Sequence, residues 1–104
     1  MSRSESLAVY LRAQARRRLD RVEVKDDGRN AKCALALLDT AAYAASLPDD
    51  DPLILMLDQA GCFGPLGCEK FDPGEAGTSL IRLWQGGEPH ELLLALPAAI
   101  TAAT

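Results

Sequence analysis

The side chains most able to do chemistry in this sequence are three cysteines and one histidine: Cys33, Cys62, Cys68 and His90. The cysteines are spaced C-x28-C-x5-C. A structural zinc site or an iron–sulfur cluster uses four soft ligands and usually contains a closely spaced cysteine pair. The chain has no such pair, so we expect no metal or other cofactor and expect the thiols to be buried and inert. A metal- or thiol-dependent protein that uses the three cysteines stays open as an alternative.

The cysteine spacing is similar to that of the WhiB-like iron–sulfur regulators, whose pattern adds a C-x2-C pair and a later Gly-Trp-Gly-Gly turn. Gln59 stands three residues before Cys62, where the first cysteine of that pair would be, and residues 83–87 read LWQGG. The resemblance implies an iron–sulfur regulator, but the chain lacks the fourth ligand that such a cluster requires.

A cysteine–histidine nucleophile is a second chemical possibility, because a thiolate activated by an imidazole is the attacking group of many hydrolases. Cys62 and Cys68 fall in a Gly- and Pro-rich segment, and His90 directly follows Pro89. Spacing alone does not bring these side chains together, so we assign no catalytic residue and favour a protein that is not an enzyme.

Charge is divided unequally along the chain. The formal net charge is −4, which disfavours a general nucleic-acid binder. Residues 1–32 carry nine basic and five acidic side chains, a net charge of +4, whereas residues 33–104 carry two basic and ten acidic ones, a net charge of −8. We expect the two parts to attract each other or to solvate opposite faces.

The arginines of the first segment fall on or beyond the flanks of a predicted amphipathic helix. We predict that Arg12, Arg16 and Arg17 bind a partner, together with Trp84, the single tryptophan, as an anchor. Nucleic acid is a less favoured partner for the same helix, because no aromatic interleaving or helix-turn-helix spacing accompanies the arginines.

Hydrophobic spacing predicts the elements that position these side chains. The first helix is expected over about residues 4–22, with a Ser2-x-x-Glu5 capping signature at its start. Its apolar face is expected to contain Leu7, Ala8, Leu11 and Ala15 and to continue to Leu19 and Val22. The second is expected from an N-cap at Asn30 to residue 47, apolar nearly all round and therefore buried at the centre. A third helix over residues 52–61 is expected to be capped by Asp51.

The last part of the chain is predicted to contain a packed loop followed by two helices. Residues 62–77 read as a packed loop under which Cys62, Phe63, Leu66, Cys68 and Phe71 can lie. Residues 78–85 are expected to form a short helix. A final helix is expected to begin near residue 89 and to kink or end near residue 97.

Residues 1–104 are thus predicted to form a single all-α domain of four or five helices with a buried central helix. The alternative is an α+β fold with short strands near residues 78–84 and 92–96. Neither a secretory signal nor a membrane span is visible, and the composition is typical of a GC-rich bacterial genome. We therefore expect a small cytoplasmic protein-interaction or accessory protein that can self-associate. A nucleic-acid-associated transcriptional regulator is the alternative.

Overall fold

The computed structural model describes residues 2–103 and shows no strand in that range. Its helices are α1 (Arg3–Leu19), the short 3-10 helix η1 (Val24–Asp26), α2 (Arg29–Ser46), α3 (Pro52–Gln59), α4 (Gly74–Leu83) and α5 (Pro89–Ala103). The all-α prediction is confirmed. The α+β alternative is wrong, because α4 and α5 occupy the two segments proposed as strands.

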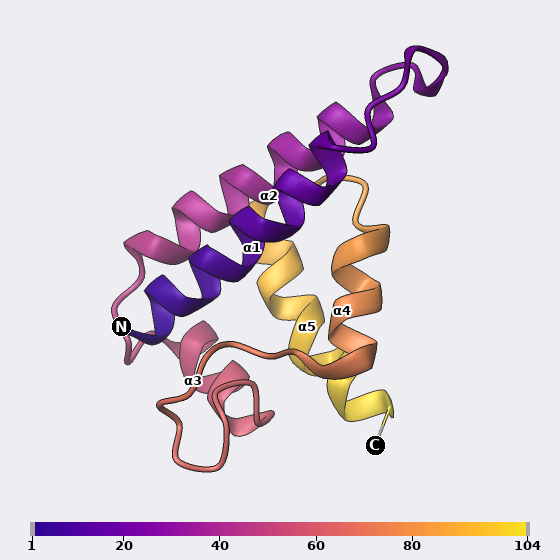
Figure 1. The fold of residues 1–104 in the computed structure, drawn as a ribbon. Helices are drawn as coiled ribbons and strands as arrows, with labels where there is room; N and C mark the ends of the chain where they lie inside the picture. Colours follow the sequence, from indigo (N-terminus) through magenta and orange to yellow (C-terminus); the bar gives the residue numbers. More distant parts are fainter. Residues whose placement is uncertain (1, 104) are drawn as a thin grey trace.

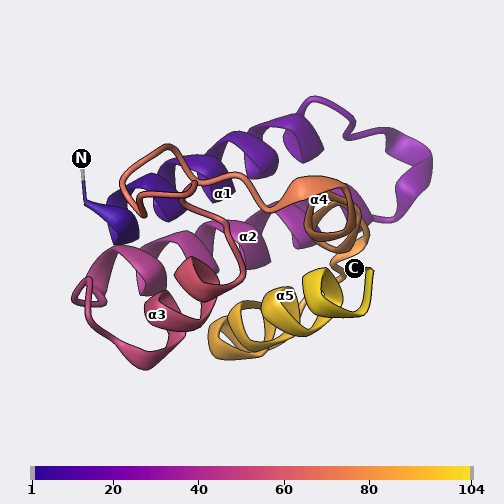
Figure 2. The ribbon, with the colours of Figure 1, turned by 90° about the horizontal axis from the view of Figure 1, so that it is seen from below.

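The helices are arranged around a long hairpin formed by α1 and α2, which run antiparallel (Figure 1). Helices α3, α4 and α5 all lie on one side of this hairpin, and the turn that contains η1 extends beyond them (Figure 1). Helix α2 lies between α1 and α5 and packs against both (Figure 2). One face of the hairpin is therefore covered, and no helix within residues 2–103 packs on the opposite face.

Helix α1 begins and ends for different reasons. At its start, the Ser2 hydroxyl accepts a hydrogen bond from the Glu5 N–H, as the capping signature predicts. At its end the helix stops at Leu19, short of the predicted boundary near residue 22. Leu19 is 46% exposed and Val22 is 48% exposed. The predicted extension of the apolar face is wrong: the end of α4 contacts the neighbouring Arg18 and leaves the Leu19 and Val22 side chains about half exposed.

Helix α2 begins two residues earlier than predicted. Its N-cap is Gly28, in a left-handed conformation with φ of 77°, and not Asn30. The Asn30 amide donates instead to the Arg21 carbonyl and to the Asp26 carboxylate, while its oxygen accepts from Arg18. These hydrogen bonds stabilise the turn between α1 and α2, so Asn30 stabilises this connection and does not cap α2.

Only one face of α2 is buried. This face contains Cys33, Ala34, Leu37, Thr40, Ala41 and Ala44. On the opposite face Leu35 is 61% exposed and Leu38 is 37% exposed. Helix α2 does lie between α1 and α5, as a central helix should. Its outward apolar side chains, which we predicted to be buried, are exposed to solvent.

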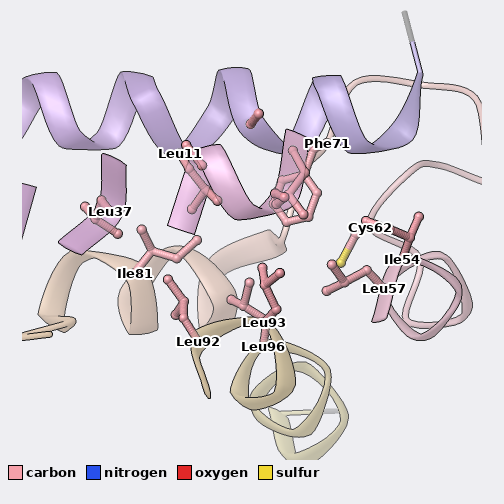
Figure 3. Close-up of a cluster of buried hydrophobic side chains, with 14 of the residues drawn as sticks. Leu11, Leu37, Ile54, Leu57, Cys62, Phe71, Ile81, Leu92, Leu93 and Leu96 are labelled. Atoms are coloured by element: carbon pink, nitrogen blue, oxygen red, sulfur yellow. The ribbon is translucent and has the colours of Figure 1, made fainter. Parts of the chain in front are cut away.

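The core lies where the covered face of the hairpin meets the other three helices. Leucine, isoleucine and phenylalanine side chains from every α-helix and from the loop after α3 converge there (Figure 3). The fully buried large members are Leu7, Leu11, Leu37, Ile54, Leu57, Phe63, Ile81, Leu92, Leu93 and Leu96. At about 25 cal/mol per Å² of buried apolar surface, this convergence is the main force that holds the helices together.

The irregular segment between α3 and α4 packs on the core, as predicted, but only in part. Cys62, Phe63 and Phe71 are buried, whereas Leu66 is 82% exposed and Cys68 is exposed. Two bonds from α1 hold the segment: Arg3 Nε donates to the Gly67 carbonyl (2.8 Å), and the Phe71 N–H donates to the Ser6 hydroxyl (2.8 Å). Leu66 and Cys68, which were expected to lie under the loop, are therefore exposed despite their apolar side chains.

Helix α5 continues through Pro97 to Ala103. Pro97 is buried within the helix, so the predicted stop does not occur there. Across residues 2–103 no helix combines the length and the apolar character that crossing a membrane requires.

The start of α1 is joined to the connection between α2 and α3 by Asp49. Its carboxylate accepts from the N–H groups of Arg3 (3.2 Å) and Ser4 (3.2 Å) and from the Ser4 hydroxyl (3.3 Å). Partial desolvation alone would raise the pKa of Asp49, but these hydrogen bonds and the Arg3 charge together lower its pKa below the usual value. The ionised form is therefore favoured in the folded state.

We predict that Asp49→Ala lowers the free energy of unfolding by about 0.5–1 kcal/mol, the lower part of the range for a lost helix cap. Because folding lowers the pKa of Asp49, its contribution is complete above the unfolded-state pKa of about 3.9 and is lost as the pH falls through the folded-state pKa. Urea unfolding at a series of pH values measures this difference, with Asp50→Ala as the matched control. An equal loss at neutral and at strongly acidic pH would contradict the assignment.

Candidate functional site

The cysteines do not form a common site. Cys33 and Cys62 are each 1% exposed, whereas Cys68 is exposed. Within residues 2–103 no group of three or more His, Cys, Asp or Glu side chains is placed to hold a metal ion. Burial raises the pKa of Cys62 to about 11, and the nearby carboxylates of Asp72 and Asp58 add to the shift. Cys62 is therefore held as a thiol, the state with little nucleophilic or metal-binding capacity.

We predict that Cys68 alone reacts with iodoacetamide in the native protein at mildly alkaline pH. With a pKa of about 11, roughly one Cys62 thiol in a thousand is ionised near pH 8, and it is also shielded from the reagent. Peptide mass spectrometry locates the modified residue, with protein unfolded in guanidinium as the positive control. Modification of Cys62 at a rate close to that of Cys68 would contradict this prediction.

The three arginines predicted to bind a partner are exposed but do not share one surface. At 100° per residue, Arg12 and Arg16 lie within 40° of each other on α1, whereas Arg17 lies 140° from Arg12. Arg17 faces α4, where it lines a small recess with Ile81 and Arg82. Arg12 and Arg16 thus lie on the flank of α1 that is turned away from α4.

Trp84 lies at the end of α4, on the Arg17 side of α1. Its carbonyl accepts a hydrogen bond from Arg18 Nη2 (3.3 Å), and its half-buried indole packs on the core. A Cβ at Gly87 would lie 3.2 Å from the Trp84 ring, so the indole also rests closely on the chain that leads into α5. The observed contacts of Trp84 fix the junction between α4 and α5.

Arg18 makes two side-chain hydrogen bonds inside the fold, and we did not predict a role for it. Arg18 Nη1 donates to Asn30 Oδ1 (3.1 Å), so one guanidinium joins α1, the start of α2 and the end of α4. Among the described residues, the buried side-chain donors with no hydrogen-bond partner are Arg18 Nε and Trp84 Nε1. The sequence signal for this role is the position of Arg18 at the edge of the apolar face of α1.

The basic and acidic parts of the chain are joined directly at one point. Arg3 Nη2 lies 3.5 Å from Asp58 Oδ2, and this is the single ion pair within residues 2–103. The expected attraction between the two parts is therefore confined to the start of α1. Arg12, Arg16 and Arg17 form no ion pair with an acidic side chain in the described part of the chain.

The outward face of α2 carries an apolar stripe. Leu35, Leu38, Ala42 and Ala45 follow the alternating three- and four-residue spacing of a coiled-coil seam, and all four are exposed. Lys32 and Asp39 are exposed along one edge of this stripe. An exposed seam of this kind matches the groove-facing side of a helix that packs on another helix.

A hollow of about 680 Å³ lies beside the segment between α3 and α4. Its Tyr10 and Thr78 hydroxyls hydrogen-bond each other (3.1 Å), and its Glu69, Lys70 and Asp72 side chains are exposed. None of the residues predicted to act in binding or chemistry lines it.

Comparisons with models of known protein families, with curated proteins and with solved structures give no match to this chain.

Proposed function

We propose that the protein is a small, non-catalytic interaction protein that binds an acidic amphipathic helix of a protein partner. The binding surface is the outward face of the α1–α2 hairpin. The observation that carries this proposal is the exposed apolar stripe of α2 on the one face of the hairpin that no other helix covers.

The stripe supplies the apolar half of the surface. Leu35, at 61% exposed, and Leu38, at 37% exposed, stand beside Ala42 and Ala45, whose small side chains let a second backbone approach closely. A partner helix that places leucines in this seam buries apolar area on both sides, which stabilises the complex by about 25 cal/mol per Å² before the cost of association.

Charge selects the partner. Arg12 and Arg16 lie on the flank of α1 away from α4 and have no acidic side chain to neutralise them within the described fold. Acidic residues along one edge of the incoming helix would meet these guanidiniums as charge-assisted hydrogen bonds. The combination of an apolar seam and a basic edge favours a protein helix over nucleic acid, whose phosphates require no apolar seam.

We predict that the protein binds a synthetic helical peptide with a leucine seam and glutamate edges, and does not bind the same peptide with lysine edges. Fluorescence anisotropy of labelled peptides measures binding. Leu35→Glu, which places a carboxylate in the seam, should abolish it. Arg12→Glu/Arg16→Glu should weaken it by about tenfold or more, because two charge-assisted contacts become repulsive.

The matched control is Arg17→Glu/Arg82→Glu, which changes the net charge equally on the α4 side and should leave peptide affinity unchanged. Equal binding of both peptides would contradict the proposal. If duplex DNA binds with strong salt dependence and Leu35→Glu does not affect it, the nucleic-acid alternative is the correct one. If the wild-type protein is a dimer by native mass spectrometry and Leu35→Glu is a monomer, the face is occupied by a second copy.

A further inference from the structure

A small recess between α1 and α4 is surrounded by arginines. Arg17, Arg18 and Arg21 line it from the end of α1 and the residues that follow, and Arg82 lines it from α4. Leu37 and Ile81, both fully buried, lie beneath them. The recess has a volume of about 10 Å³, room for one oxygen-sized group. We propose that it binds a phosphate-type oxyanion.

The charges of the recess are not balanced by the protein. None of its lining residues is acidic, and the ion pair of the described fold, Arg3–Asp58, involves none of them. Four positively charged side chains around one small recess repel one another, and the buried apolar residues of its lining strengthen the charge interactions there. A bound anion would convert this repulsion into attraction.

Arg18 is held in place by neutral groups. Its two terminal nitrogens donate to Asn30 Oδ1 and to the Trp84 carbonyl, and its buried Nε has no partner in the described structure. Neither acceptor carries a charge, so the contacts orient the guanidinium without neutralising it. Gln14, a buried amide that also lines the recess, offers a further donor.

The chemistry of the lining favours phosphate over a monovalent ion. Planar guanidiniums bind tetrahedral oxyanions through paired N–H groups, and several of them together match a divalent charge. Because the recess admits one oxygen, the remaining oxygens of the ligand face the exposed Arg17, Arg21 and Arg82 at its mouth. Free phosphate and the phosphoryl group of a small metabolite present this same chemistry.

Isothermal titration calorimetry with inorganic phosphate and with glycerol 3-phosphate, at constant ionic strength kept with sodium chloride, tests the site. We expect the wild-type protein to bind at least one of these ligands. Arg17→Gln/Arg82→Gln should weaken binding by about tenfold for each arginine removed, since charged hydrogen bonds of this strength are lost. Both residues are exposed and form none of the described internal bonds, and circular dichroism verifies the fold of the variant.

Arg12→Gln/Arg16→Gln is the matched control, because it removes the same charge from the opposite flank of α1; it should leave affinity unchanged. Equal weakening by both variants would show a diffuse counter-ion effect and overturn the site. An absence of heat with both ligands at millimolar concentration would also overturn it. Tighter binding of the ester assigns the recess to a phosphorylated metabolite, and tighter or equal binding of the free ion assigns it to phosphate.

Discussion

The close packing of α1 against α2 is the constraint on which the rest of the structure depends. Buried alanines occur on the facing sides of both helices: Ala8 and Ala15 on α1, and Ala34, Ala41 and Ala44 on α2. Small side chains let two helix axes approach closely, which leaves Leu7, Leu11 and Leu37 to meet the remaining helices. Helix α5 packs on α2, helices α3 and α4 pack on α5, and apolar side chains from all of them meet those of the hairpin in one core (Figure 3). The opposite face is left open as a consequence.

The same arrangement divides one arginine-rich helix into two different surfaces. Arg12 and Arg16 border the open face, beside an apolar seam, whereas Arg17 and Arg18 face α4 and meet Arg82. The first surface combines charge with exposed leucines and is suited to a protein helix. The second concentrates charge around a recess of oxygen size and is suited to a small anion. Because the two surfaces lie on opposite flanks of α1, variants of one serve as controls for the other.

The sequence was sufficient to predict the helices and the N-caps of α1 and α3, since hydrophobic spacing and capping residues act locally. Ser2 and Asp51 cap α1 and α3 as predicted, and the core positions of the first three turns of α1 are correct. Burial at the end of α1 and around α2 could not be predicted, because it depends on where the other helices stop. Leu19, Leu35 and Leu38 are leucines, as core residues often are, but no other helix covers their side chains in the described fold. The grouping of Arg17, Arg18 and Arg82 could not be predicted either, because α4 is distant from α1 in the sequence and only the tertiary fold brings the two helices together.

The unequal burial of the two faces of α2 is most directly tested by two substitutions two residues apart. Leu37 is fully buried and Leu35 is 61% exposed. A carboxylate placed at a buried position without a partner costs far more than the marginal stability of a small domain can absorb, whereas a carboxylate at an exposed position costs little. Thermal unfolding followed by circular dichroism should therefore show that Leu35→Asp keeps nearly the wild-type midpoint and that Leu37→Asp does not fold. Comparable losses in both variants, or a larger loss in Leu35→Asp, would contradict this structure of the hairpin.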